Sequence, residues 1–377
     1  MTIPLTRFAD LVHLSSMRTA DPLAAGIERF VGLEHIEPEN LHIRSWGNVA
    51  DGTTFMQTFK TGQVLFGKRR AYQRKVAVAD FEGVCSSDIY VFESKDPSKL
   101  LPELLPFICQ SEGFYQYAIK TSAGSLSPRT NWSHLAEYEF PLPPVDEQRR
   151  IADLLWAADD VIVKNQEVVE KLSTIQKLQL DNWLIDESLN SEWQEVKLDD
   201  VCNIQNGQVD PKEQPYRDMI HIASDDIESG TGRILEMNTA AQDKVSSGNY
   251  LFTEKAIVYS KIRPNLKKVV FPKFMGVCSA DVYPIYPREN ILPELLFQLL
   301  LSETFTQYAT SQSARSAIPK INRNGLLAFK FKLPPIERQE QITQDLTTVF
   351  QSLEVAKQHV QNSKILKQKL LEKVLND

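Results

Sequence analysis

Hydrophobic and polar positions follow a mixed pattern in the first half of the chain. Segments 64–70, 75–81 and 87–94 are rich in β-branched and aromatic residues and are bounded by glycine or charged turns, which predicts short strands. Segment 101–118 has the apolar spacing of a helix, and segment 138–144 reads as a strand that ends in two prolines. A globular α/β part is therefore expected before residue 144.

After Pro143-Pro144, and again after Pro334-Pro335, the apolar period becomes that of a long helix. Apolar residues recur at steps of three and four, which is typical of a coiled-coil seam. The expected seam residues of the first helix are Ile151, Leu154, Ala158, Val161, Asn165, Val168, Leu172 and Ile175. Those of the second helix are Ile342, Leu346, Val349, Leu353, Ala356, Val360 and Leu370, with the polar Ser363 interposed.

Each of these helices is expected to be longer than its own globular part, because about 40 helical residues form a rod of roughly 60 Å. The other helix is then the obvious partner. Since each helix follows its own globular part, a pair that keeps those parts separate must run antiparallel. Asn165 lies near the middle of its seam and is expected to fix the register of the pair.

The second half of the chain repeats the first. LPELLPFICQSEGFYQYA at 101–118 returns as LPELLFQLLLSETFTQYA at 292–309, and GVCSSD at 83–88 returns as GVCSAD at 276–281. Such a long period indicates a duplicated structural unit. The fold class predicted is α+β, with two pseudo-repeated α/β domains separated by an antiparallel coiled coil of two long helices. The expected bounds are 1–143 and 187–334 for the domains, and 144–186 and 335–377 for the helices.

Composition narrows the setting of the protein. Hydrophobic residues make up 42% of the 377 positions, and no apolar run approaches the roughly 18 residues of a membrane span. The N-terminus lacks a basic segment followed by an apolar one, and the four cysteines are scattered, so a cytoplasmic location is expected. Without a CxxC pair or clustered histidines, no bound metal is expected.

The net charge of −7 argues against a nucleic-acid partner, but the positive charge is concentrated locally. Segments 60–75 and 255–273 contain no carboxylate and occupy the same place in each repeat. A basic strand-turn-strand, with Tyr72 in one copy and Tyr259 in the other, suits DNA binding. The alternative is a solvated hairpin face, which the recurrence disfavours. The candidate DNA-binding residues are Lys68, Arg69, Arg70, Tyr72, Arg74, Lys75, Lys261, Arg263, Lys267 and Lys268, with Arg129, Arg315 and Lys320 in the matching loops at 122–131 and 311–322.

Catalytic chemistry finds little support in the sequence. Cys85 and Cys278 align in the repeat, but no histidine accompanies them, so buried small residues are expected there. His35 and His221 do not align and are expected to be structural or surface histidines. A nuclease site could be built from Asp80, Glu93 and Lys95, but the second repeat does not retain it. No glycine-rich phosphate loop and no Asn-Pro-Pro-aromatic motif is present, so no catalytic residue is predicted.

Over essentially its full length the chain resembles the specificity subunits of Type I restriction-modification systems. The resemblance rests on PLPPVDEQRRIADLL, KLPPIERQEQITQDL, the two GVCSxD segments and SKIRPNLKKV. It implies two target-recognition domains that each read one half of a bipartite DNA site, and helices that set the gap. It further implies two methylation subunits and then restriction subunits as partners, which would hold S-adenosylmethionine, ATP and Mg.

The first repeat departs from this pattern, because Ala71 replaces the proline that follows Arg263 in the second repeat. Two alternatives stay open at this point: a protein scaffold of two repeated domains, and an enzyme that acts on DNA by itself.

Overall fold

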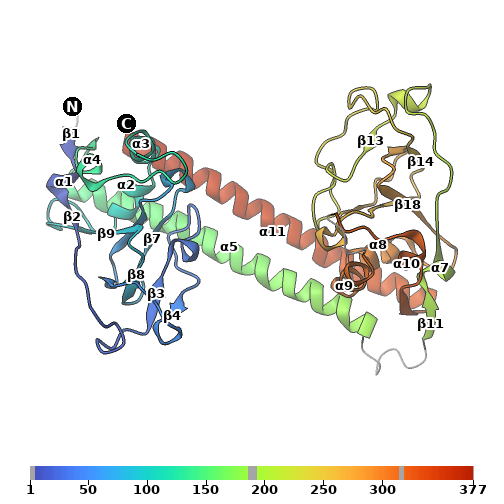
Figure 1. Cartoon of the computed structure of the whole chain (residues 1–377), viewed down its shortest axis with the longest axis horizontal. Helices are drawn as coiled ribbons and strands as arrows, with labels where there is room; N and C mark the ends of the chain where they lie inside the picture. Colours follow the sequence, from blue (N-terminus) through green and yellow to red (C-terminus); the bar gives the residue numbers. More distant parts are fainter. Residues whose placement is uncertain (1–4, 186–192, 314–317, 377) are drawn as a thin grey trace. The chain divides into compact units, whose positions relative to one another are not determined.

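The computed structural model describes residues 5–185, 193–313 and 318–376. The chain forms two compact units, which we call the first unit (Met1–Asn165 with Gln358–Asp377) and the second unit (Gln166–Lys357). Each unit therefore contains a globular part and a segment of both long helices (Figure 1). In the described residues, no helix is both long and apolar enough to cross a membrane.

The globular part of the first unit contains two four-stranded sheets. In one, the order is β2-β9-β6-β7 and all neighbours are antiparallel, with β2 at Val12–Leu14, β9 at Ile89–Ser94, β6 at Val64–Gly67 and β7 at Val76–Val78. In the other, the order is β4-β3-β8-β5 and β3 runs parallel to β8, with β4 at Gly47–Asn48, β3 at Arg29–Val31, β8 at Gly83–Cys85 and β5 at Gln57–Phe59. The strands expected at 64–70, 75–81 and 87–94 are thus β6, β7 and β9.

Short helices and a third strand pair complete this part. They are α1 (Phe8–Leu11), α2 (Leu105–Gln110), α3 (Glu112–Lys120) and α4 (Trp132–Leu135), with β1 (Leu5–Arg7) antiparallel to β10 (Glu139–Pro141). Three 3-10 turns are η1 (Leu33–His35), η2 (Val49–Asp51) and η3 (Ala71–Gln73). The larger core of the unit collects buried side chains from the β2-β9-β6-β7 sheet, from α2 and from α3.

The second unit repeats this plan with small differences. Its antiparallel sheet has the order β12-β18-β15-β16, with β12 at Cys202–Ile204, β18 at Val282–Pro287, β15 at Ile257–Ser260 and β16 at Val269–Val270. The second sheet has the order β13-β17-β14, with β13 at His221–Ile222, β17 at Gly276–Cys278 and β14 at Tyr250–Phe252, and β13 is parallel to β17. The remaining elements are β11 (Gln194–Lys197) paired with β19 (Lys330–Leu333), α7 (Leu198–Val201), α8 (Pro293–Leu301), α9 (Glu303–Ser311), α10 (Arg323–Leu327), η4 (Tyr216–Asp218) and η5 (Pro264–Leu266).

The helix expected at 101–118 is instead two helices, and so is its counterpart in the second unit. Ser111 separates α2 from α3 with an extended backbone, and its hydroxyl accepts the amide hydrogen of Phe114 at 3.3 Å. Ser302 does the same between α8 and α9, where it caps Phe305 at 3.1 Å. A serine that caps a new helix in this way gives the amide groups of the first turn a partner. Apolar spacing alone does not reveal such a break.

Two buried glutamines fix the point where each globular part meets its long helix. The side-chain oxygen of Gln148 accepts the amide of Leu101 at 2.9 Å, and its nitrogen donates to the carbonyls of Lys99 and Pro143. Gln339 makes the same three bonds, to Leu292, Asn290 and Pro334. Both side chains are at most 1% exposed, so a residue that both donates and accepts is required at these positions.

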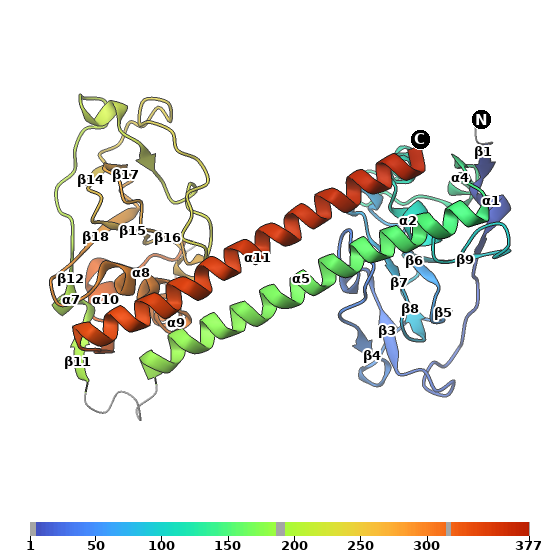
Figure 2. The same cartoon turned by 180° about the vertical axis from the view of Figure 1, so that it is seen from behind.

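The long helices are α5 (Val145–Ile185) and α11 (Ile336–Asn376). Within the first unit their segments lie side by side and antiparallel (Figures 1 and 2), because Asp159 of α5 meets Lys367 of α11 while the later Asn165 meets the earlier Ser363. The Asn165 amide donates to the Ser363 hydroxyl at 3.5 Å. On α11 the expected seam residues Ile342, Leu346, Leu353 and Ala356 are buried, the first two in the core of the second globular part, and Val349, Val360 and Leu370 are half-buried.

The seam expected on α5 is wrong at four positions. Leu154, Val161, Val168 and Ile175 are 43–50% exposed, whereas the next residues Leu155 and Ile162 are buried and Val169 is half-buried. Ile151 is buried, and Ala158, Asn165 and Leu172 are half-buried. The sequence has apolar doublets at three of the four wrong positions, and one residue is a rotation of about 100° on a helix. Helix α5 therefore has a second apolar stripe, formed by these four exposed residues, in addition to its buried one.

A buried ionic group lies on the packed face of α5 in the first unit. The Asp159 carboxylate contacts the Lys367 ammonium at 2.5 Å and His42 Nε2 at 2.7 Å. Burial would raise the pKa of Asp159, but the hydrogen bond from His42 and the charge of Lys367 outweigh it, so that pKa is lowered. In the second unit, Arg233 contacts Glu354 of α11 at 3.1 Å. In both units a side chain of the globular part, His42 or Arg233, thus bonds a carboxylate of a long helix.

Candidate nucleic-acid interface

The basic segments form the same tight turn in both units. Each lies between two antiparallel strands, β6 and β7 in the first unit and β15 and β16 in the second, with a 3-10 turn between them. Arg70 and Arg74 flank the first turn with φ of 55° and 54°, and Arg263 and Lys267 flank the second with φ of 47° and 50°. A left-handed backbone at a non-glycine residue costs roughly 1–2 kcal/mol. Its retention at equivalent positions indicates that the shape of this turn matters.

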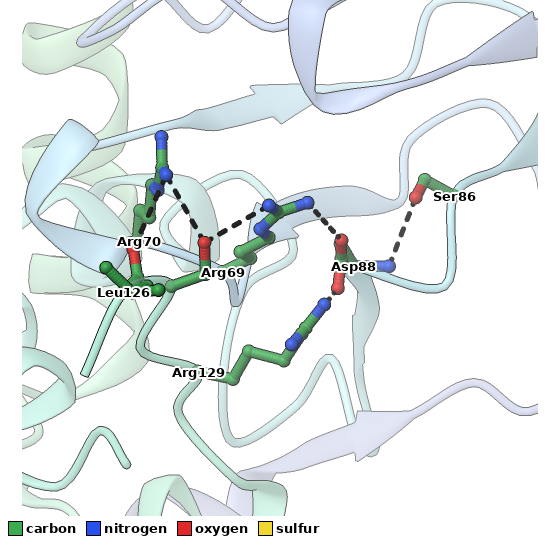
Figure 3. Close-up of polar contacts among 7 residues, drawn as sticks. Arg69, Arg70, Ser86, Asp88, Leu126 and Arg129 are labelled. Atoms are coloured by element: carbon green, nitrogen blue, oxygen red, sulfur yellow. Dashed lines mark hydrogen bonds and ion pairs between the residues drawn. The ribbon is translucent and has the colours of Figure 1, made fainter. Parts of the chain in front are cut away.

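In the first unit Arg69 and Arg129 converge on Asp88 (Figure 3). Arg129 Nε donates to one carboxylate oxygen at 2.8 Å, and Arg69 approaches the other at 3.4 Å. Burial would raise the pKa of Asp88, but its bonds to Arg129 and Arg69 hold that pKa below its usual range. The Lys68 ammonium lies 4.6 Å from the centre of the Tyr90 ring. Burial lowers the pKa of Lys68. Two guanidinium groups thus hold one carboxylate, whose charge also acts on the nearby Lys68.

The second unit repeats this arrangement with lysines. Asp281 contacts Lys261 at 3.4 Å and Lys320 at 3.3 Å, and the Lys261 ammonium lies over the Tyr283 ring at 5.4 Å. The strand-like pairing of Arg69 with Arg129 returns as that of Ile262 with Lys320. The structure therefore brings together the turn and the loop that the sequence suggested as separate candidates. Arg315 lies outside the described residues.

The two arginines at the start of the turns differ in their surroundings. Arg70 donates to the Ser127 hydroxyl at 3.2 Å and to the Leu126 carbonyl at 3.4 Å, in the loop after α3. Arg263 is exposed, and its backbone amide donates to the Pro319 carbonyl at 2.8 Å. Both are placed at the same corner of the turn, but Arg70 is anchored to the neighbouring loop.

Four of the candidate residues hold the fold together. Arg74 pairs with Glu112 at 2.6 Å, and Lys267 pairs with Glu303 at the same distance. The hydrogen bond from Lys267 lowers the pKa of Glu303. Two lysines donate to backbone carbonyls, Lys75 to Leu33 at 2.6 Å and Lys268 to Ser224 at 2.8 Å. Their positive charge contributes to this surface, but their side chains already have partners.

The two tyrosines proposed for the turns do not correspond. Tyr72 lies in η3 and is 53% exposed, whereas Tyr259 lies in β15 and is 2% exposed. Tyr259 is core, because its position in the repeat is that of the buried Phe66. The residue that matches Tyr72 is Asn265.

The cysteines have no environment for catalysis. All four are buried and free. Burial raises the pKa of Cys85 to about 12 and raises the pKa of Cys278 further. A thiol that stays protonated at neutral pH is a poor nucleophile, as expected of a small core residue.

The proposed nuclease residues have other contacts. Lys95 donates to the Ala9 carbonyl at 2.5 Å, and Glu93 accepts a hydrogen bond from Gln63 at 2.8 Å. Asp80 is exposed. Glu93 and Lys95 therefore bond to different partners and not to each other, and the bond of Lys95 to a backbone carbonyl serves the fold.

Three side chains of the second unit could offer ligands to a metal ion. His221, Asp226 and Asp243 have ligand atoms within 4.8 Å of one another. However, His221 Nδ1 already pairs with Asp243 at 2.8 Å, and Asp226 accepts the amide hydrogen of Ala223. In the first unit His35 accepts the amide hydrogen of Gly32 at the equivalent turn, so a capping role accounts for Asp226.

Sequence reasoning missed cations that lie outside the carboxylate-free runs. The Arg29 guanidinium lies 4.4 Å from the ring centre of Trp46, which is 41% exposed, and 4.9 Å from that of Phe81. Arg323 is 5.3 Å from the ring centre of Tyr283 and donates to the Gln205 carbonyl. These contacts join residues far apart in sequence, so no local pattern could have found them.

The sequence of this chain is similar to one protein family and to several of its members. The sequence profile of the Type I restriction modification DNA specificity domain matches residues 49–173 and 190–363. The specificity subunit of the Type I restriction enzyme EcoDI from Escherichia coli is 34% identical over 176 residues, which are 47% of this chain and 39% of that protein. The specificity subunit of the MjaVIII enzyme from Methanocaldococcus jannaschii is 22% identical over 389 residues, which cover 96% of this chain and 84% of that protein.

A solved structure shares the fold. The S subunit of a Type I restriction-modification system from M. genitalium superposes with a TM-score of 0.61 at 14% identity, over 100% of this chain and 97% of that one. The E. coli match spans less than half of that relative, whereas the archaeal match and the structure extend over most of theirs. The matches confirm the expected resemblance and the α+β fold with two repeated domains.

Proposed function

The chain belongs to the family of Type I restriction modification DNA specificity domains, and on this premise we propose that it recognises DNA for a multisubunit enzyme. It carries two such domains, matched over residues 49–173 and 190–363. Each domain reads one half of a bipartite, asymmetric site in double-stranded DNA. The complex works in the cytoplasm.

The observation that carries this proposal is the repeated cluster of cations around one carboxylate. Asp88 and Asp281 hold their cations at equivalent corners of the two domains, beside turns with the same left-handed backbone. Cations held in fixed positions suit phosphate contacts, and an exposed fork such as Arg263 suits a guanine edge. The acidic remainder of the chain limits indiscriminate binding.

The long helices have two tasks in this proposal. They set the gap between the half-sites, since 41 helical residues form a rod of roughly 60 Å. They also dock the two methylation subunits, to which restriction subunits are added. The exposed stripe on α5 supports docking: Leu154, Val161, Val168 and Ile175 follow one another at intervals of seven, as apolar residues do in a helix that packs on another helix.

The chain itself performs no methyl transfer and no cleavage. The thiols are buried, and the nuclease candidates are engaged in separate contacts, so the alternative of an independent DNA enzyme loses its support. S-adenosylmethionine, ATP and Mg belong to the partner subunits. Incubation of the purified chain with DNA and each cofactor should leave the DNA intact and unmethylated; turnover that Asp80→Ala abolishes would contradict this.

Selection from a random duplex library tests the proposal against the scaffold alternative. The full chain should enrich two short sequences separated by a fixed gap, and Arg70→Ala and Arg263→Ala should each alter the enrichment of one of them. A scaffold of protein partners would enrich no sequence. Mapping of methylated adenines in a host that carries the chain and its methylation subunits should return the same two half-sites.

A further inference from the structure

Leu126 is the most exposed large hydrophobic side chain in the described part of the chain, at 88%. A single exposed apolar residue is ordinary on a protein surface. Its neighbours in the segment 123–128 are alanine, glycine, serine and proline, so no larger side chain shields it. What sets Leu126 apart is the way in which its loop is held.

The loop between α3 and α4 is closed and fixed to the basic turn. Ala123 and Arg129 exchange backbone hydrogen bonds of 3.0 Å and 2.9 Å across its base. The amide of Thr130 donates to the Lys68 carbonyl at 3.0 Å, and the amide of Arg70 donates to the Pro128 carbonyl at 2.7 Å. A loop held in this way loses little conformational entropy when it binds a partner.

Two guanidinium groups converge on the tip of this loop (Figure 3). Arg69 and Arg70 both donate to the Ser127 hydroxyl, at 3.1 Å and 3.2 Å, and Arg70 also donates to the Leu126 carbonyl. The Nε atoms of both arginines are buried without a hydrogen-bond partner. One neutral hydroxyl therefore lies between two cations. Arg69 also approaches the Asp88 carboxylate at 3.4 Å, so Arg70 supplies most of the positive charge beside the protruding Leu126.

We propose that Leu126 reads a base in the first half-site by apolar contact with a thymine methyl group. The inference rests on the proposed function and adds a specificity residue to it. Cations flanking the tip would hold the DNA backbone, while the tip itself enters a groove. The methyl group of thymine is the apolar feature of the major-groove edge, so it is the partner that a leucine without polar atoms can distinguish.

Replacement of thymine by deoxyuracil tests this directly, because it removes only the methyl group. The probes are duplexes selected from a random library by the full chain, with deoxyuracil at one thymine at a time. At one thymine of the first half-site, loss of the methyl should weaken binding about fourfold, the effect of one buried methyl-sized group. In Leu126→Ser the same replacement should have no effect, whereas Leu126→Met should retain it.

Leu366→Ser is the matched control, since it removes a 64% exposed leucine from α11. It should leave every deoxyuracil effect unchanged. The inference is overturned if Leu126→Ser keeps the methyl dependence at every thymine, or if it weakens all duplexes equally. If the wild-type chain selects no sequence at all, the proposed function fails as well, so the two failures are distinguishable.

Discussion

Arg263 and Lys267 flank the same turn, yet their side chains have different contacts. Lys267 is paired with Glu303 at 2.6 Å, while Arg263 is exposed at the corner of the turn. A charge that is already paired contributes to the surface potential but is not free to form a fork with a base edge. We therefore propose Arg263 as the base-reading residue of the second domain, with Lys267 in a positioning role.

Replacement of Arg263 by alanine should relax the preference at one position of the second half-site. The expected loss of discrimination is about 1–3 kcal/mol, the value of a bidentate contact with a base, and the first half-site should be unaffected. Binding to duplexes that differ at single positions, measured at several salt concentrations, provides the test. A uniform loss for all sequences, with a salt slope reduced by about one, would instead identify a phosphate contact. Lys330→Ala, which removes an exposed cation paired with Glu195 outside the basic turn, is a control for the loss of charge.

At the scale of elements, the junction glutamines join each globular part to its long helix. Gln148 uses its oxygen for Leu101 and its nitrogen for Lys99 and Pro143, entirely out of contact with solvent. The same geometry at Gln339 explains why both repeats have Gln after Pro-Pro and an acidic residue.

Gln148→Glu should destabilise the first unit by at least about 2 kcal/mol. A carboxylate accepts but cannot donate, so two buried carbonyls lose their partner, and each unsatisfied group costs about 1–3 kcal/mol. Thermal unfolding of the full chain, followed through the transition of each unit, measures the effect. Gln351→Glu, at an exposed site on α11, should change little. An unchanged first-unit transition in Gln148→Glu would contradict this role.

The buried Asp159–Lys367 ion pair joins α5 to α11 in the first unit. Asp159→Ala should cost about 3–5 kcal/mol, because it leaves Lys367 buried and uncompensated. The double change Asp159→Leu with Lys367→Met should be neutral or stabilising. Chemical denaturation of the first unit compares them, with the exposed Asp160→Ala as control. A large cost in the double variant as well would show that shape, and not charge, is decisive there.

The lowered pKa of Asp159 gives this pair a pH dependence with a definite sign. Its contribution is complete above the ordinary carboxyl pKa of about 4 and is lost as the pH falls through the lower folded value. The stability difference between wild type and Asp159→Asn should therefore be constant from pH 7 to about 5 and shrink in more acidic buffer. A difference that does not shrink at any pH below about 4 would exclude titration of this carboxyl as its cause.

The elements also show how far sequence reasoning extends. Strands β6, β7 and β9 and both long helices follow from apolar periodicity, since burial on one side requires that pattern. The face of α5 does not follow from it, because doublets such as Leu154-Leu155 fit two helix rotations equally well. The repeat located the basic turns, but the use of Arg74 and Lys75 in local bonds depends on Glu112 and Leu33, which only the tertiary fold brings near.

For the whole molecule, the proposal is that the two long helices act as a ruler, setting the gap between the half-sites, while the two domains act as independent readers, each recognising its own half-site. Removal of one heptad from both α5 and α11 keeps the packed faces in phase and shortens each rod by roughly 10 Å. The gap should then shrink by about three base pairs at 3.4 Å per step, with both half-sites unchanged. Methylation mapping of the variant complex measures this. An unchanged gap would contradict the ruler, and altered half-site sequences would contradict the independence of the readers.

The burial of the cysteines also has a practical consequence. Cys85, Cys109, Cys202 and Cys278 are all buried, and burial raises the pKa of each thiol. Maleimides react with accessible thiolates, so the native chain should resist alkylation while folded. A cysteine introduced at Leu126 would then be the single site of attachment for a fluorophore or a photocrosslinker. Without removal of any natural residue, such a conjugate could report which nucleotide lies beside this loop.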